Sequence, residues 1–219
     1  MPAPLKLSPS SLNAFRACPR CFWMDVHGKG PPPGPPMALL TVMDALEKNY
    51  YDKYRPALPP LLKGKLPVKL VDAALAQRIR KYLYWNDEGT GAALRGKMDD
   101  CFVDNEGALI VMDNKTRAGE FKEIYDVYKF QLDCYAFLLA KNGYKVGKRG
   151  YIVYFVPDKS SDIEKGVRFT ADVKEVELHP GRVVPTFRDA VKVARQAKPP
   201  ARHEECELCH WVEMMTMEA

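Results

Sequence analysis

The sequence lacks any long apolar run. No stretch of the 219 residues approaches the roughly 20 consecutive apolar residues that a membrane-spanning helix needs. The beginning of the chain, MPAPLKLSPSS, lacks the apolar core of a secretory signal peptide. No internal repeat is visible. We therefore expect a cytoplasmic protein with no membrane partner, and we exclude repeat architectures.

An extreme of charge or composition is also missing. Hydrophobic residues make up 47% of the chain and charged residues 28%, which is typical of a globular domain. This apolar content is enough for one well-packed domain, so we expect a single domain over residues 1–219. The formal net charge of +5 is mildly basic, which permits a polyanionic partner without requiring one.

The six cysteines have few structural uses in a cytoplasmic protein, where disulfides are rare. Two Cys-x-x-Cys pairs lie near opposite ends of the chain: Cys18 with Cys21, and Cys206 with Cys209. Four thiolates can hold Zn²⁺ or a [4Fe–4S] cluster, and either would tie the ends together. The pairs would lie in an N-terminal segment with a proline-rich connector (1–36) and a C-terminal segment (198–219). Two independent pairs of reduced or redox-active thiols are the alternative.

The remaining cysteines and the histidine beside the second pair have plainer interpretations. Cys101 and Cys134 fall in expected core elements, where cysteine acts as a small hydrophobic residue. His210 follows Cys209 directly and is expected to be a bystander rather than a ligand.

The centre of the sequence predicts a β-hairpin. Apolar and β-branched residues mark strands over Met98–Val103 and Leu109–Lys115, and Asp104–Gly107 has the residues of a tight turn. The other expected elements are helices over Met37–Tyr54, Val71–Tyr84, Glu123–Lys141 and Val183–Ala197, strands over Tyr151–Val156 and Val167–Leu178, and a turn over Trp85–Gly91. The first of these helices shows its spacing in Leu39, Leu40, Met43, Leu46 and Tyr50.

Acidic residues and a lysine converge on this hairpin. Asp113 and Lys115 are two residues apart on one strand and therefore point to the same face, while Asp99 lies on the partner strand. Two converging carboxylates suit Mg²⁺ or Mn²⁺, and a nearby lysine can position or deprotonate a water. Asp100 would point to the opposite face, and a shift of one residue in register would exchange the two aspartates. An exposed hairpin with a surface ion pair is the alternative.

Three motifs follow one another along the chain: Gly96-x-x-Asp99, Asp113-x-Lys115-Thr116, and Gln131-x-x-x-Tyr135 on a helix. Their order and spacing resemble the PD-(D/E)XK nuclease superfamily. The resemblance is greatest to the RecB-like branch, which includes the iron–sulfur exonucleases of CRISPR adaptation and of the recombination helicase–nucleases. The N-terminal segment SPSSLNAFRACPRCFW is also similar to that branch, so the resemblance extends from the Cys18 region to Cys209.

The resemblance implies a fold and an activity. The fold would be α/β with a restriction-endonuclease-like core, in which helices flank a central mixed β-sheet. The activity would be that of a Mg²⁺- or Mn²⁺-dependent deoxyribonuclease, expected to be an exonuclease, in DNA repair, recombination or CRISPR adaptation. Its substrate would be single-stranded DNA or DNA with single-stranded ends, and its partners a helicase or CRISPR adaptation proteins.

The resemblance also implies residue roles. Asp99 and Asp113 would bind the metal with the backbone carbonyl of Asn114, and Lys115 would orient or activate the attacking water. Gln131 would contact DNA or order the site, and Tyr135 would support it.

The same comparison raises two questions about metals. Helix 37–54 carries no histidine where the family often has one, so Asp44 or Glu47 would supply the third ligand, unless both are solvated carboxylates. The iron–sulfur relatives typically have one N-terminal and three C-terminal cysteines. The two-plus-two arrangement of this chain keeps zinc open beside the [4Fe–4S] cluster.

Two other hypotheses belong to different functional classes. Arg188, Lys192 and Arg195 fall on one side of the last predicted helix and could meet phosphates, although a solvated face is the plainer interpretation. The chain could be a catalytically inactive nucleic-acid-binding or adaptor protein of nuclease fold, which the missing helix histidine favours and the intact Asp99, Asp113 and Lys115 argue against. A zinc-stabilised interaction module is the third possibility.

Overall fold

The protein divides into two compact units. The structure is a computed structural model that describes residues 5–32, 34–35, 37–119 and 123–217. We call Pro36–Tyr84 with Gly96–Pro180 the sheet unit, and Met1–Pro35 with Trp85–Arg95 and Gly181–Ala219 the terminal unit. Both units combine segments that are distant in sequence, and the prediction of one domain over residues 1–219 stays a prediction. Among the described residues, no helix is long and apolar enough to cross a membrane.

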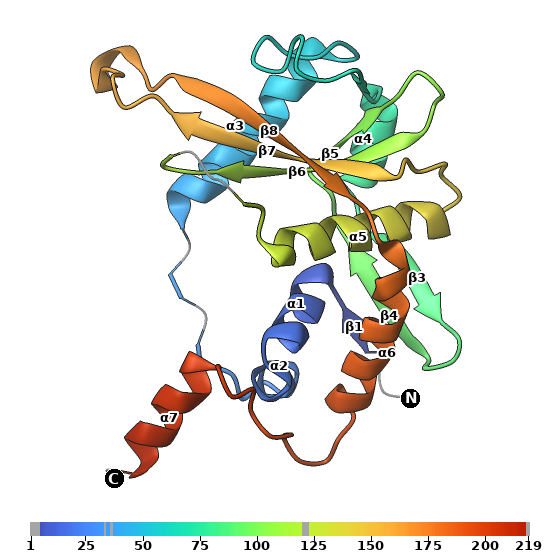
Figure 1. The fold of residues 1–219 in the computed structure, drawn as a ribbon, viewed down its shortest axis with the longest axis vertical. Helices are drawn as coiled ribbons and strands as arrows, with labels where there is room; N and C mark the ends of the chain where they lie inside the picture. The colour runs from blue at the N-terminus through green and yellow to red at the C-terminus, as the bar shows by residue number, and fades with distance from the viewer. Residues whose placement is uncertain (1–4, 33, 36, 120–122, 218–219) are drawn as a thin grey trace. The chain divides into compact units, whose positions relative to one another are not determined.

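The sheet unit contains a five-stranded mixed sheet with the order β2-β5-β6-β7-β8 (Figure 1). Its strands are β2 (Lys69–Leu70), β5 (Asp100–Val103), β6 (Leu109–Thr116), β7 (Arg149–Pro157) and β8 (Phe169–Glu177). Strands β6 and β7 are parallel, and the other neighbouring pairs are antiparallel. The predicted α/β class with a mixed central sheet is confirmed, and β7 is central because its continuous apolar run is buried from both faces.

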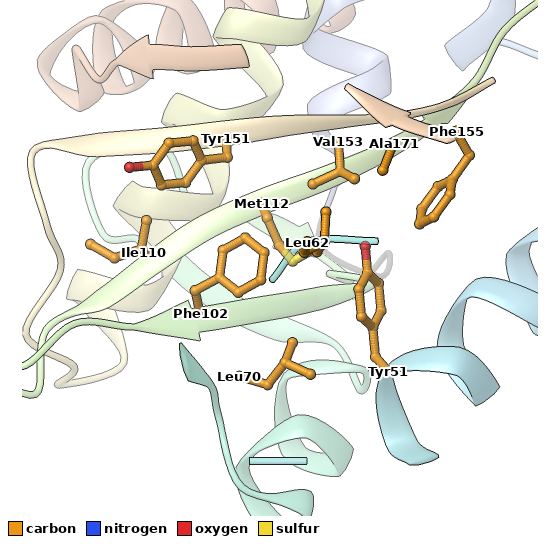
Figure 2. Close-up of a cluster of buried hydrophobic side chains, with 10 residues drawn as sticks. All are labelled: Tyr51, Leu62, Leu70, Phe102, Ile110, Met112, Tyr151, Val153, Phe155 and Ala171. Atoms are coloured by element: carbon orange, nitrogen blue, oxygen red, sulfur yellow. The ribbon is translucent and has the colours of Figure 1, made fainter. Parts of the chain in front are cut away.

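Helices cover both faces of this sheet. Helix α3 (Ala38–Tyr54) packs on one face, α5 (Asp126–Lys141) lies along the other, and α4 (Ala73–Ile79) packs beside β5 (Figure 1). Helix α5 ends as predicted, because Asn142 caps it and Gly143 adopts a φ of 85°, a left-handed conformation that glycine tolerates. The core on the α3 face is a cluster of apolar side chains shown in Figure 2: Tyr51, Leu62, Leu70, Phe102, Ile110, Met112, Tyr151, Val153, Phe155 and Ala171.

The predicted central hairpin is present as β5 and β6. Asp100 pairs with Met112, and Val103 pairs with Leu109. The carboxylate of Asp104 accepts hydrogen bonds from the backbone N–H groups of Glu106 and Ala108, and this fixes the turn. The first strand begins at Asp100, two residues later than predicted.

The buried stripe of α3 differs from the predicted one. Leu39, Leu40 and Leu46 are exposed, whereas Met43, Glu47 and Tyr51 are buried at intervals of four residues. Only one narrow face of this helix packs on the sheet, so the apolar spacing alone identified the helix but not its buried side.

The segment between α4 and β5 was also predicted incorrectly. Helix α4 ends at Ile79 rather than Tyr84, and the expected turn is present only over residues 88–91, where it joins strands β3 (Leu83–Asp87) and β4 (Ala92–Gly96). The Leu-Tyr-Trp sequence at the start of β3 favours a strand, because aromatic side chains pack well on a pleated surface. The short strand β2 also lies outside the predicted elements.

The terminal unit combines helices with a small three-stranded sheet of order β1-β4-β3, in which β1 is Lys6–Leu7. Its helices are α1 (Pro9–Ala17), α2 (Pro19–Val26), α6 (Val183–Ala194) and α7 (Glu207–Met217). Ser8 and Ser11 form a reciprocal capping box at the start of α1, as the Ser-Pro-Ser-Ser sequence predicts. Helix α6 is three residues shorter than predicted, and α7 was not predicted.

Candidate active site and cysteine centre

Strand β6 presents an acid and a base on one face of the sheet. Asp113 and Lys115 form an ion pair, and the Asp113 side chain is only 3% exposed. The ammonium group of Lys115 also lies 4.7 Å from the ring centroid of Tyr128 on α5. An alternating strand therefore places the buried carboxylate and the lysine side by side, and α5 holds the lysine from above.

Asp99 approaches the same site from the start of β5. Its Oδ1 lies 3.1 Å from Nζ of Lys48, a residue of α3 that also pairs with Asp44. The charge of Asp99 acts on Asp113, because it contributes to the raised pKa of that group. Two lysines thus face the two aspartates that the sequence predicts as metal ligands. Lys48 was not predicted, although its position directly after Glu47 on the helix was a usable signal.

Glu47 is the acidic residue of α3 that faces this site. It is 8% exposed, and its Oε1 accepts a hydrogen bond of 3.2 Å from the hydroxyl of Thr116 at the end of β6. Of the two candidates for a third ligand, Glu47 is buried, whereas Asp44 is exposed at the surface of the helix.

Burial makes both inner carboxylic acids hard to ionise. It raises the pKa of Glu47 to about 7 against the opposing Thr116 hydrogen bond, and the charge of Asp99 adds to this increase. Burial also raises the pKa of Asp113 to about 6, although the charge of Lys115 acts in the opposite direction. A divalent cation would favour the ionised form of all three acids, so the group has the electrostatics of a cation site.

Asp100 has a different role from its neighbour. Its carboxylate is fully buried and pairs with Arg55 and with Arg80, whose Nη2 lies 2.9 Å away. Both arginines also bind Asp52, at distances of 2.7–2.9 Å. The backbone N–H of Cys101 donates a further hydrogen bond of 2.8 Å to Asp100. Asp100 therefore belongs to a buried ion network on the α3 side of the sheet.

Asn114 points away from the aspartate and lysine that flank it. Its side-chain oxygen accepts a hydrogen bond of 2.7 Å from the hydroxyl of Tyr51, which lies in the core cluster. The side-chain amide nitrogen is buried and has no hydrogen-bond partner in the described structure. The side chain is thus a core anchor for α3, and only the backbone carbonyl of Asn114 is left for the predicted metal contact.

Gln131 and Tyr135 interact on α5 as their spacing predicts. Nε2 of Gln131 donates a hydrogen bond of 3.0 Å to the hydroxyl of Tyr135. The ring of Tyr135 lies close to Gly96, where an added Cβ would come within 3.4 Å of it and within 2.6 Å of Leu138. Gly96 therefore allows α5 to approach the strand that leads into Asp99, and the three predicted motifs meet in one unit.

The four cysteines of the two pairs meet in the terminal unit. The Sγ atom of Cys21 lies 3.3 Å from that of Cys209 and 3.5 Å from that of Cys206, and Cys18 lies 3.8 Å from Cys209. All four Sγ atoms lie within 4.8 Å of one another, and the cysteines are free thiols. The predicted four-cysteine cluster is confirmed as a group that can hold a metal ion. Thiolates bound tetrahedrally to one Zn²⁺ would be about 3.8 Å apart, from a Zn–S bond of about 2.3 Å.

The electrostatics of this cluster also suit a cation. Burial opposes ionisation of Cys18, but hydrogen bonds from the backbone of His203 and Cys21 outweigh it and lower the pKa of this thiol to about 6. Burial raises the pKa of Cys209 to about 11, and burial with neighbouring thiols raises the pKa of Cys21 further. Four thiolates at these distances repel one another, so a bound cation would stabilise them all. Within the described residues, this is the one set of three or more Cys, His, Asp or Glu side chains close enough to share an ion, so Asp99, Asp113 and Glu47 would have to approach one another to bind a common cation.

The basic residues of α6 are partly engaged within the terminal unit. The guanidinium of Arg188 forms two hydrogen bonds with Asp87, at 2.8 and 3.1 Å, and that of Arg195 donates to the carbonyl of Thr90. Lys192 is exposed. Both arginines therefore connect α6 to the β3–β4 hairpin, and their predicted contact with nucleic acid stays a prediction.

Comparison with known proteins identifies the family. The family model described as the PD-(D/E)XK nuclease superfamily matches residues 64–214, which include Asp99, Asp113 and Lys115. The chain belongs to this superfamily. Membership implies a nuclease, a hydrolase that acts on nucleic acid, and the superfamily typically uses a divalent metal ion.

Similarity to solved structures supports the fold. A structure described as "Crystal structure of SSO0001" is similar over 98% of this chain and 87% of that chain, with 17% sequence identity and a TM-score of 0.50. Identity at this level shows a shared fold only. No curated protein matches the chain.

Proposed function

We propose that the sheet unit hydrolyses DNA phosphodiester bonds with Mg²⁺ or Mn²⁺ held by Asp99, Asp113 and Glu47. One observation carries this proposal: Asp99, directly before β5, lies near enough to Asp113 on β6 and Glu47 on α3 that its charge raises the pKa of both, beside the ion pair of Asp113 with Lys115. Lys48 and Lys115 neutralise two of these acids in the structure. Ammonium groups already offset the negative charge of these carboxylates. A divalent cation would take over part of that role, so the site is suited to bind one.

The chain's own residues would divide the remaining work. When bound, a divalent cation would polarise the scissile phosphate and activate a water. Lys115, held by Asp113 and Tyr128, would orient that water and offset the charge that develops on the phosphate. The backbone carbonyl of Asn114 would complete the metal ligands, while its side chain holds Tyr51.

Gln131 and Tyr135 would order the site rather than perform chemistry. Their mutual hydrogen bond fixes both side chains on α5. The charges of Asp113 and Asp99 add to the raised pKa of Tyr135, which supports a role for this hydroxyl near the acids. We propose that Gln131 contacts the DNA and that Tyr135 holds it in position.

The finer biological role follows from the resemblance to the RecB-like branch. We propose an exonuclease that acts on single-stranded DNA or single-stranded ends in repair, recombination or CRISPR adaptation. Its partners would be a helicase or CRISPR adaptation proteins.

For the cysteine centre we propose a structural metal that joins α1, α2 and α7. Resemblance favours a [4Fe–4S] cluster, and the Sγ separations of 3.3–3.8 Å favour a single Zn²⁺ ion. Quantification of iron, acid-labile sulfide and zinc in protein purified without oxygen distinguishes the two.

The test of the nuclease function is cleavage of end-labelled single- and double-stranded DNA with Mg²⁺, Mn²⁺ or EDTA. Asp113→Asn and Lys115→Ala should each abolish cleavage while the protein stays folded. Glu106→Gln is the matched control, because this acid lies exposed in the turn of the same hairpin. A product ladder would distinguish exonuclease from endonuclease action, and full activity in either active-site variant would overturn the assignment.

The second candidate is an inactive nuclease-fold protein that binds DNA. It is favoured by the same lysines, which already offset the charges of Asp99 and Asp113. Isothermal titration with Mn²⁺ separates the two candidates. A binder would take up no Mn²⁺ at the sheet unit and would cut no DNA, but would retain DNA affinity.

A further inference from the structure

Tyr154 carries a buried hydroxyl that the fold leaves without a partner. The residue is 2% exposed, and its Oη has no hydrogen-bond partner in the described structure. A buried hydroxyl without a partner is unfavourable, because its hydrogen bonds with water are lost and not replaced, so its retention needs an explanation. A bound ligand that accepts a hydrogen bond from this hydroxyl would explain it.

Tyr154 lies beside the candidate catalytic residues. In the parallel pairing of β6 and β7 it is directly opposite Lys115, so both side chains occupy the same face of the sheet. Asp113, Lys115 and Arg117 follow one another at alternate positions of the chain through and just beyond β6. The guanidinium of Arg117 lies 5.2 Å from the ring centroid of Tyr154. The face of the sheet that carries Asp113 therefore also carries Tyr154, whose ring lies close to the guanidinium of Arg117.

A cavity opens at this place. Its volume is about 420 Å³, and its lining includes Tyr154, Gly119, Thr170 and the ion pair between Asp172 and Lys174. Asp172 is opposite Tyr154 in the β7–β8 pairing, but its charge is balanced by Lys174 at 3.0 Å. The cavity is therefore large enough for a phosphate with its sugar, and its acid is already neutralised.

We propose that Tyr154 and Arg117 form a binding subsite for the DNA phosphate next to the scissile one. The proposal rests on the proposed nuclease function and specifies how its substrate strand is held. A neutral tyrosine hydroxyl donates one hydrogen bond, and a guanidinium supplies further donors in a plane that suits phosphate oxygens. Successive phosphates follow one another along a DNA strand, and Lys115 and Arg117 follow one another along one face of the sheet.

The first test is binding of a short fluorescent single-stranded oligonucleotide, measured by anisotropy with Ca²⁺ in place of Mg²⁺. Tyr154→Phe removes only the unpartnered hydroxyl, so the melting temperature should stay the same or rise while the dissociation constant increases about tenfold. Tyr151→Phe is the matched control on the same strand. Its hydroxyl bonds Glu175 on β8, and it should leave DNA affinity unchanged. Arg117→Ala should weaken binding and reduce the salt slope by about 0.7.

A second test identifies the phosphate. Oligonucleotides with a single methylphosphonate, moved one position at a time, remove one phosphate charge in each substrate. At one position next to the scissile bond, the substitution should weaken wild-type binding about as much as Tyr154→Phe does. The variant should be insensitive to the same substitution. Equal losses in wild type and Tyr154→Phe at every position would overturn the subsite.

The two proposals fail in distinguishable ways. If the wild type cuts no DNA but Tyr154→Phe still weakens binding at one phosphate, the subsite stands and the nuclease function falls. If the wild type cuts DNA and Tyr154→Phe binds and cuts normally, the nuclease function stands and the subsite falls.

Discussion

Asp99 and Asp100 are adjacent in the chain but belong to different environments. The first faces Lys48 beside the inner acids, and the second is locked between Arg55 and Arg80. Asp99→Ala should therefore abolish cleavage with a change in unfolding free energy within about 1 kcal/mol, as for a partly exposed ion pair. Asp100→Ala should lower the unfolding free energy by about 3–5 kcal/mol, because it leaves two guanidinium groups with only the more exposed Asp52 as a partner.

Urea denaturation and the cleavage assay, run on both variants, check this contrast. Activity should be lost without instability in the first variant, and stability should be lost in the second. If both variants lose the same stability, or if Asp99→Ala cuts normally, the assignment of Asp99 to the site is wrong.

The raised pKa of Glu47 predicts that the stability of the metal-free protein depends on pH. Burial raises its pKa in the folded state to about 7, above an unfolded value of about 4.3. The folded protein thus holds the proton more tightly, so the associated stability is present below the unfolded pKa and is lost as the pH rises through 7. In EDTA, Glu47→Gln should gain in melting temperature over the wild type as the pH rises from 5 to 8.

Addition of Mg²⁺ should reverse this difference. The wild type should be stabilised at pH 8, because the cation favours the ionised acids, and Glu47→Gln should respond less. Thermal melts across this pH range, with EDTA or Mg²⁺, give both curves. If the difference in melting temperature between the wild type and Glu47→Gln in EDTA does not change with pH, Glu47 is not buried in its acid form.

At the residue scale, local pattern could predict only part of the site. Asp113 and Lys115 could be paired because strand alternation is a local rule, and Asp99 because a hairpin joins neighbours in sequence. Lys48 had only its place beside Glu47 as a signal, and Tyr154 had none. Their positions depend on how α3 packs and on which strand lies parallel to β6, and both are properties of the folded sheet.

At the element scale, the close contact of β6 and β7 depends on Gly150. An added Cβ would lie 2.8 Å from Cγ2 of Val111 and 3.0 Å from its carbonyl oxygen. A branched side chain and a strand backbone cannot move far, so Gly150→Ala should lower the unfolding free energy by about 1–3 kcal/mol. Gly181→Ala is the control, because its added Cβ would meet nothing within 4 Å. Urea denaturation of both variants should show a loss only in the first.

Element prediction succeeded where a single signal dominated. Helix α5 has an apolar pattern and a terminal Asn-Gly, and β7 is a continuous apolar run between polar residues. The β3–β4 hairpin was not predicted. Leu83 also fits the helical spacing of Leu75 and Ile79, so the start of β3 was assigned to a helix. Helix α7 was not predicted because its exposed apolar residues show no clear amphipathic face.

At the scale of the whole molecule, the terminal unit is assembled from three separate segments of the chain. The ends of the first and last segments meet at the cysteine cluster. The spacing of the two Cys-x-x-Cys pairs could predict that they meet, because four metal ligands must converge in space. It could not predict that Trp85–Arg95 completes the unit, because that segment carries no ligand.

The cysteine cluster should determine whether α7 stays attached to the unit. Cys206 precedes this helix and Cys209 lies within its first turn, and Arg202 in the preceding loop binds Glu213 of the helix at 2.9 Å. Cys209→Ser should lose the bound metal and melt at a lower temperature, since metal binding contributes directly to folding. Elemental analysis and thermal melts check both outcomes. Cys134→Ala, in the core of the sheet unit, should retain the metal in full.

Limited proteolysis gives an independent measurement of the same link. Metal-free protein, prepared with a strong chelator, should be cut between Gln196 and Glu205 faster than the metal-loaded protein, because α7 is then held by fewer contacts. The result would be contradicted by protein that contains no metal as purified, titrates all its cysteines as free thiols, and is cut at the same rate with and without chelator. The cluster would then be a set of reduced thiols, and the terminal unit would be stabilised by its apolar core and by the pairing of Arg188 with Asp87.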